Sequence, residues 1–197
     1  MLCAGAIETA ILLLRSGIGD PAAVGAGFTD HPELVIPYRN LVDGSAFPLL
    51  QVNARVGGAE LRPYTASFGL GVALSYARSR GRLRLAAGQL VLEYDYLASA
   101  ADRSDLADAL DAGTAIVSRM AARGVVDWEG TDFEARIGTS QHLSGTCRLG
   151  AVVDERCRVH GVDGLSIADT SIIPVQLGCG PAATAVMIGE RFAALLP

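Results

Sequence analysis

Apolar residues recur at helical spacing near the start of the chain. The run from Ile7 to Leu14 follows this spacing and stops at Gly17, and Gly5 precedes it. The pattern predicts a very short strand, a glycine turn and a helix.

A second helical pattern covers residues 104–123. Asp102 or Ser104 can cap this helix, because a side-chain oxygen at that position accepts hydrogen bonds from the first turn. One broad apolar stripe predicts a helix with one face packed against the core. The stripe comprises Leu106, Leu110, Ala112, Ile116, Val117 and Met120.

Between these helices, β-branched and aromatic residues are separated by turn signals at Asp43-Gly44 and Gly57-Gly58. This arrangement favours an antiparallel sheet. A short helix is expected over residues 21–27. The expected strands are residues 33–37, 47–53, 64–69, 71–76 and 90–96.

Residues 78–85, RSRGRLRL, allow two interpretations. Clustered arginines suggest phosphate binding, but Leu83 and Leu85 would face one way on a strand and Arg82 and Arg84 the other. A half-exposed strand with a solvated arginine face is the better-supported interpretation.

The chain ends in a glycine-rich stretch, residues 141–197, with short strands expected at 157–160 and 165–168 and a closing helix. Because it returns to the glycine-rich character of the start, we expect both ends to form one portion of an α+β protein. The predicted division is 1–44 with 141–197, and a lobe of antiparallel sheet covered by helices at 45–140.

Charge and composition exclude several classes of partner and site. The net charge is −5 and all sixteen basic residues are arginine, without a basic run, which argues against nucleic acid as a partner. Apolar runs fall short of the roughly 20 residues that span a bilayer, so no membrane span is expected and the protein should be cytoplasmic. The four cysteines lack zinc spacing, so we expect no metal and four reduced, buried thiols.

His142 is the best candidate for chemistry. An imidazole exchanges protons near neutral pH, and Gly145 allows backbone or ligand to approach closely. His160 lies between a strand and a glycine, where a structural role is more probable. A hydrolase with Ser144 as nucleophile is disfavoured, since no G-x-S-x-G elbow is present and Ser144 lies only two residues from His142.

Two further segments carry polar or glycine signals. Asp169-Thr170-Ser171 follows a short strand, where the acid can bind a ribose or cap a turn. Residues 178–183, GCGPAA, fit a dinucleotide fingerprint but lack its strand and its acidic residue, so we interpret the match as fortuitous. The N-terminus of the closing helix can nevertheless stabilise anionic charge on a ligand.

The segments QHLSGTCRLG, VVDERCRVHGVDGL, IADTSIIP and MIGER together resemble the C-terminal signature of the glucose-methanol-choline (GMC) flavin oxidoreductases. CAGAIE with LLLRSGIG, DHP at 30–32 and SRGRLRL also resemble family segments, in the same order. The DHPE and GPA variants are similar to those of the mycofactocin-associated branch. The resemblance spans nearly the whole chain.

The resemblance implies a partial FAD-binding portion at 1–44 and 141–197, a substrate-binding lobe at 45–140, and oxidation of a small-molecule alcohol to a carbonyl with hydride transfer to flavin N5. It implies that His142 is the catalytic base. The electron acceptor is left open. The residues implied at the cofactor are Asp169, Thr170, Gly180, Pro181, Ala182, Asp30 and His31.

Two departures from the family pattern bear on activity. Ala182 stands where the family usually has a second His or Asn, so Gln176 or Cys179 would have to compensate. The N-terminal FAD-binding half, with its glycine loop, is missing. The alternative interpretation is a non-catalytic fragment or interaction module that keeps the fold without the cofactor.

Overall fold

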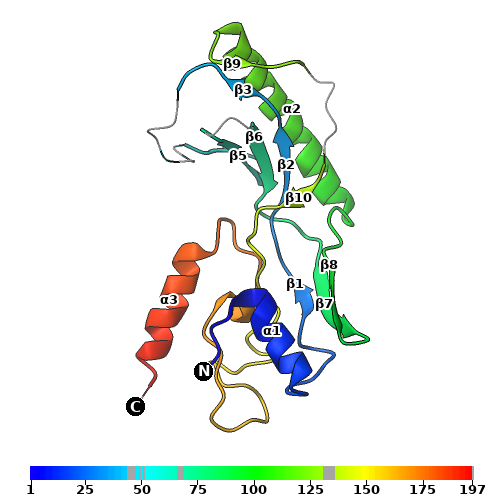
Figure 1. Cartoon of the computed structure of the whole chain (residues 1–197), viewed down its shortest axis with the longest axis vertical. Helices are drawn as coiled ribbons and strands as arrows, with labels where there is room; N and C mark the ends of the chain where they lie inside the picture. Colours follow the sequence, from blue (N-terminus) through cyan, green and yellow to red (C-terminus); the bar gives the residue numbers. More distant parts are fainter. Residues whose placement is uncertain (44–47, 49, 51, 66–68, 131–135, 197) are drawn as a thin grey trace. The chain divides into compact units, whose positions relative to one another are not determined.

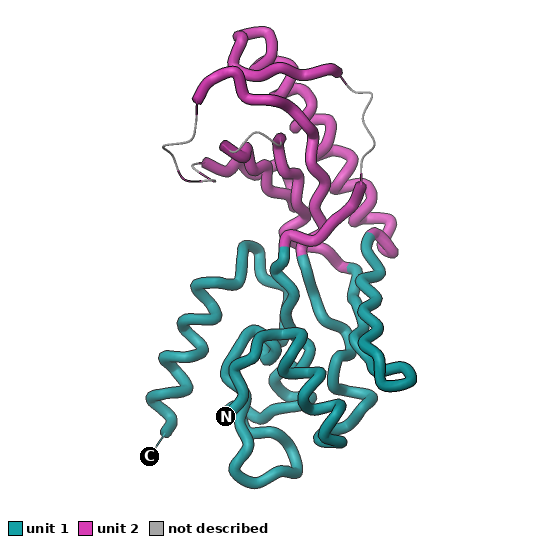
Figure 2. Tube along the Cα trace, in the orientation of Figure 1, with its two compact units in different colours: residues 1–30, 79–96, 141–197 teal, residues 31–78, 97–140 magenta. Residues whose placement is uncertain are grey.

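The structure is a computed structural model that describes residues 1–43, 48, 50, 52–65, 69–130 and 136–196. The chain forms two compact units (Figure 2). Unit 1 comprises Met1–Asp30, Ser79–Tyr96 and Gln141–Pro197, and unit 2 comprises His31–Arg78 and Leu97–Ser140. The described residues include no helix that is both long and apolar enough to cross a membrane.

Unit 2 is an antiparallel five-stranded sheet with one long helix (Figure 1). The strand order is β10-β2-β6-β5-β4, and a separate pair joins β3 to β9. The elements are β2 (Pro32–Ile36), β3 (Arg39–Asn40), β4 (Ala54–Val56), β5 (Ala59–Pro63), β6 (Leu70–Leu74), α2 (Ala100–Ala122), β9 (Val126–Asp127) and β10 (Gly138–Thr139).

The core of unit 2 lies between the sheet and α2. Ile36 and Val72 are fully buried against the helix, which itself buries Val117. Gly113 permits this close approach, since a Cβ there would lie 2.9 Å from Cδ1 of Ile36. Five of the six residues of the predicted stripe, all except Ala112, therefore belong to the packed face.

The strands β2 and β5 also carry a buried cluster of charged side chains, at positions that alternate with their apolar core residues. Arg62 donates to Glu60 at 3.0 Å and to Glu33 at 3.3 Å, and Ser140 donates to Glu33 at 2.6 Å. Tyr64 also donates to Glu33, and burial raises the pKa of Tyr64 to about 12. Because a buried charge is costly unless paired, both carboxylates depend on the buried Arg62 guanidinium, and Glu60 also pairs with the more exposed Arg55.

Unit 1 contains two helices, a three-stranded sheet of order β1-β7-β8 and much irregular backbone. Its largest buried residues include Leu13, Phe28 and Leu83, which share one core. Its elements are α1 (Gly5–Arg15), β1 (Ala26–Phe28), β7 (Gly81–Ala86), β8 (Gln89–Glu93), the 3-10 helix η1 (Thr170–Ile172) and α3 (Ala182–Ala193).

Helix α1 is fixed at both ends. At its C-terminus, Ile18 N–H donates to Leu13 O at 2.9 Å, and Gly17 takes φ of 64°. This is a Schellman ending, in which glycine adopts the left-handed conformation at no steric cost. At its N-terminus, the Asp169 carboxylate accepts from Gly5 N–H at 3.0 Å and from Thr9 Oγ1 at 2.5 Å.

The mixture of helices and antiparallel sheets confirms the α+β prediction. The hairpin β7–β8 lies in unit 1, although the sequence placed it in the lobe at 45–140. The assignment of an FAD-binding portion and a substrate lobe stays a prediction.

The short helix predicted at 21–27 is wrong. Residues 21–25 form turns, because Ala23 and Val24 donate to Asp20 O, and β1 then begins at Ala26. Gly25 pairs instead with distant backbone, as its N–H donates to Thr146 O and its carbonyl accepts from Leu83 N–H. Tertiary pairing thus overrides local helix preference.

Several predicted boundaries also shift. Helix α2 begins at Ala100 after Ser99, and neither Asp102 nor Ser104 is its cap residue, because the carboxylate of Asp102 accepts from Arg78 N–H. The strand predicted at 64–69 lies earlier, as β5, and 66–68 fall outside the described residues. The strand predicted at 47–53 is partly outside them as well, and β4 follows it.

The C-terminal strands predicted at 157–160 and 165–168 are reduced to single pairings, such as Arg158 with Ser166. The interpretation of the arginine run is confirmed from Gly81 on, since Leu83 is buried in β7 and its arginines are exposed. The thiol prediction is half wrong. Cys147 and Cys157 are buried, whereas Cys3 and Cys179 are exposed.

Candidate functional site

His142 begins a segment that lies between two others in unit 1. On one side, Ser144 and Thr29 exchange both backbone hydrogen bonds at 2.9 Å, and their hydroxyls lie 3.2 Å apart. On the other, Gly145 N–H donates to Thr170 O at 3.1 Å and Cys147 N–H to Ser171 O at 2.8 Å. Backbone pairing on both sides fixes where the histidine emerges.

The half-buried imidazole of His142 faces the start of α3. A Cβ on Gly180 would lie 3.0 Å from Nε2 and 3.2 Å from Cε1 of His142, so a larger residue there would require the ring to shift by a few tenths of an ångström. Pro181 follows as the N-cap residue of α3, and no side chain caps the helix. The N–H groups of its first turn therefore have no intrahelical partner.

Asp30 lies 4 % exposed beside this segment. Its Oδ1 accepts the backbone N–H of His142 at 2.9 Å, and its Oδ2 accepts the hydroxyl of Tyr96. Sequence reasoning missed Tyr96. The spacing of Tyr94 and Tyr96 on one face of an extended segment was the available signal, but it does not name Asp30 as partner.

Asp169 and Thr170 border the site through η1. The Asp169 carboxylate holds Gly5 and Thr9 of α1 and also accepts from Ser171 N–H at 2.8 Å, so its oxygens bind protein donors. His31, 1 % exposed, belongs to unit 2. The structure thus brings His142 into contact with Gly180 through its ring and with Asp30 through its backbone, and Thr170 is bonded to Gly145.

The residues at the start of α3 fit a flat, polar cofactor such as FAD. The side-chain oxygen Oε1 of Gln176 is buried without a hydrogen-bond partner among the described residues. Ala182 and Ala183 are exposed and small, and the helix N-terminus offers free donors. The uncapped terminus lies next to His142, and together with the unsatisfied acceptor of Gln176 it can accommodate a ligand that has donors, acceptors and anionic character.

The fingerprint-like run 178–183 does not belong to a dinucleotide-binding unit. Residues 173–180, all described, contain no strand, so the strand–turn–helix context of that motif is lacking.

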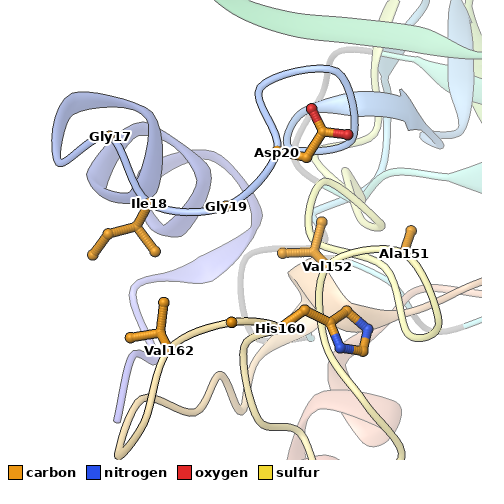
Figure 3. A pocket seen from close by; sticks show the side chains of 9 residues that line it. Gly17, Ile18, Gly19, Asp20, Ala151, Val152, His160 and Val162 are labelled. Atoms are coloured by element: carbon orange, nitrogen blue, oxygen red, sulfur yellow. The ribbon is translucent and has the colours of Figure 1, made fainter.

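A separate open pocket of about 510 Å³ lies in unit 1 at the C-terminal end of α1 (Figure 3). The side chains of Ile18 and Val162 point toward one another across it. His160 lines it, whereas His142 does not, so the two histidines occupy different environments. The described residues contain no group of three or more metal-ligand side chains that could hold an ion.

Comparison with known proteins gives a consistent result. A family model described as GMC oxidoreductase matches residues 77–189. The chain is 37% identical to an uncharacterized GMC-type oxidoreductase of Rhodococcus erythropolis, with 100% of the chain and 49% of the relative aligned. It is 26% identical to the oxygen-dependent choline dehydrogenase of Cronobacter sakazakii, with 98% and 49% aligned.

Solved structures agree on the fold. Pyridoxine 4-oxidase from Mesorbium loti matches with a TM-score of 0.81 and 26% identity, over 98% of this chain and 50% of that one. A formate oxidase variant from Aspergillus oryzae RIB40 also has a TM-score of 0.81, at 19% identity, over 99% and 53%. The chain spans about half the length of these relatives, and it belongs to the GMC oxidoreductase family.

Proposed function

We propose that this chain forms the catalytic half of an FAD-dependent oxidoreductase that converts the CH–OH group of a small alcohol to a carbonyl. The observation that carries the proposal is the imidazole of His142 held against Gly180 at the uncapped start of α3. A base and an anion-stabilising helix end lie side by side, which is what removal of a proton and a hydride requires.

Each residue has a stated task in this reaction. His142 accepts the hydroxyl proton at Nε2, the ring nitrogen that faces α3, while the two electrons of the C–H bond leave as hydride. Bound FAD would supply the acceptor for that hydride. Gly180, Pro181 and Ala182 would border the flavin ring, and the first turn of α3 would favour negative charge on it.

Ala182 offers no polar atom to share the substrate oxygen with His142. Gln176 is the better substitute than Cys179, because Oε1 of Gln176 is buried and unsatisfied, whereas Cys179 is exposed. Thr170, the first residue of η1, would also lie near the cofactor.

His31 stays a predicted cofactor residue. The remainder of the FAD site is proposed to come from the half of the relatives that this chain does not cover, and the electron acceptor is not assigned.

The test is the rate at which a primary alcohol reduces bound flavin without oxygen, in the complete enzyme, with choline, pyridoxine and benzyl alcohol as probes. His142→Ala should slow reduction by about 10²–10⁴-fold while FAD stays bound. His160→Ala is the matched control and should leave the rate unchanged. Reduction of His142→Ala at the parent rate would remove the proposal, and a protein that binds no FAD would favour the non-catalytic alternative.

A further inference from the structure

Asp30 connects three segments of unit 1 that are far apart in sequence. Its two carboxylate oxygens accept from His142 N–H, 112 residues away, and from Tyr96 O–H, 66 residues away. With 4 % of its surface exposed, the side chain meets protein rather than solvent. A carboxylate that accepts two protein donors is a fixed point, because charge-assisted bonds are shorter and stronger than neutral ones.

The phenol of Tyr96 is itself held in place. Its ring lies 4.8 Å from that of Tyr94, and Tyr94 packs edge-on against Phe28 at 5.6 Å. Phe28 is 1 % exposed and fills the space beside Gly81, where a Cβ would lie 2.2 Å from its Cζ. A row of three rings therefore runs from the core of unit 1 to the carboxylate of Asp30.

The backbone immediately before His142 has an unfavourable conformation that surrounding contacts must stabilise. Gln141 takes φ of 62°, in the left-handed region that non-glycine residues rarely adopt. Such a conformation persists only when surrounding contacts over-determine it. The Asp30 bond to the next N–H provides one of these contacts, and the Thr29–Ser144 pairing fixes the chain two residues later.

We propose that Asp30 and Tyr96 are positioning residues that hold the backbone of His142, and so aim its imidazole at the start of α3. The inference rests on the proposed function, since it takes His142 as the base. It gives Asp30 a role different from direct cofactor contact, because both of its oxygens face protein donors. Tyr96 acts only through Asp30.

The test compares variants in the complete, FAD-loaded enzyme. Asp30→Ala should slow flavin reduction by about 100-fold, because small displacements of a catalytic group are costly. Asp30→Asn keeps an acceptor for His142 and should recover about tenfold of that loss, and Tyr96→Phe keeps the ring stack and should lose about 3–10-fold. In all three, KM should change far less than the reduction rate.

The pairing predicts non-additivity. Asp30→Ala combined with Tyr96→Phe should be no slower than Asp30→Ala alone, because the proposed effect of Tyr96 on His142 passes through its bond to Asp30. Multiplied effects in the double variant would overturn the proposal. Asp20→Asn is the matched control: it also accepts a backbone N–H in unit 1, from Ala22 at 2.8 Å, and should leave the rate unchanged. If Asp30→Ala does not fold, the Asn and Phe variants and their combination decide the matter.

A second readout does not depend on turnover. With ¹⁵N-histidine labelling, the backbone amide resonance of His142, assigned by its loss in His142→Ala, should shift upfield in Asp30→Ala and less in Asp30→Asn, with no substrate present. An unmoved resonance refutes the positioning role even if His142 is catalytic. A shifted resonance together with a fully active His142→Ala supports the hold on His142 while removing the proposed function.

Discussion

In unit 2 the sheet is covered by α2, and the residues of that interface are buried on both sides. In unit 1 helix α3 buries only Phe192, while Val186 and Met187 on the same helix are 66 % and 56 % exposed. Figure 1 shows α3 at the margin of its unit. Unit 2 covers its sheet with one packed helix, whereas unit 1 presents the apolar surface of α3 next to its candidate site.

The two units therefore differ in the kinds of interaction that stabilise them. Unit 2 carries a buried ion cluster and a long packed helix. The site of unit 1 is built from the uncapped N-terminus of α3, long-range backbone pairings and side chains that bind distant segments. Four measurements can break or sharpen this contrast.

The largest effect is expected at Arg62. Replacement by Leu leaves Glu33 buried without its cation and Glu60 with only the exposed Arg55, and removal of one partner from such a cluster costs about 3–5 kcal/mol. Arg55 also pairs with Glu60, but its side chain is 55% exposed, so Arg55→Ala should leave the free energy of unfolding almost unchanged. Urea denaturation of Arg62→Leu and Arg55→Ala measures the two free energies of unfolding. Equal losses in the two variants would contradict the view that the buried ion cluster stabilises unit 2.

The two units should lose stability in different ranges of alkaline pH. Burial raises the pKa of the Cys147 thiol from 9.0 to about 11, and that of Tyr64 in unit 2 from 10.0 to about 12. Both folded-state pKa values exceed the unfolded ones, so each contribution is complete below the unfolded pKa and is lost as pH rises. Unit 1 should lose about 2–3 kcal/mol of stability between pH 9 and 11, before the stabilising contribution of Tyr64 is fully lost.

Denaturation curves from pH 8 to 12 measure this loss, and Cys147→Ala is the control that removes the lower window. A curve that is flat up to pH 11 in the parent protein would contradict the assignment. At pH 8, thiol reagents should modify Cys3 and Cys179 but reach Cys147 only after unfolding, because the thiolate is the reactive form.

A smaller effect is expected at the close approach beside His142. Gly180→Ala places a Cβ 3.0 Å from Nε2, so the ring must shift by a few tenths of an ångström. Flavin reduction in the complete enzyme should fall about tenfold, with thermal stability retained. Gly189→Ala, within α3 and with open space around it, should keep the rate and raise stability by about 0.5–1 kcal/mol. Equal rates in both variants would mean that His142 does not depend on Gly180.

The smallest effect should come from the exposed apolar residues of α3. Val186→Ser with Met187→Ser should change the chain's own unfolding free energy by no more than about 0.5 kcal/mol, since neither side chain is packed. Phe192→Ala, a buried position on the same helix, is the positive control. A large loss in the double serine variant would show that α3 is already covered in solution.

Sequence alone predicts the helices well, because their apolar faces repeat along one element. The stripe of residues 104–123 and the run from Ile7 to Leu14 both contribute to cores as the spacing indicated. Residues 21–27 mislead for the opposite reason. Their conformation is set by Thr146 and Leu83, which no local pattern reveals.

The candidate site divides in the same manner. His142 and Gly180 follow from their chemistry and from the family resemblance, but their contact spans 38 positions and needs the fold. Tyr96 was assigned only to a strand, since its bond to Asp30 joins residues that no spacing rule connects. Long-range side-chain bonds are where sequence reasoning ends.

The Asp169 carboxylate accepts hydrogen bonds from Gly5 and Thr9, which lie 164 and 160 positions earlier in the chain. Every residue of unit 2 precedes Gln141, whereas unit 1 still awaits Gln141–Pro197. At about 5–20 residues per second, the ribosome needs roughly 3–11 s to add that segment. During this interval α1 lacks the carboxylate that anchors its first turn, so the order of translation itself delays the candidate site until Gln141–Pro197 emerges.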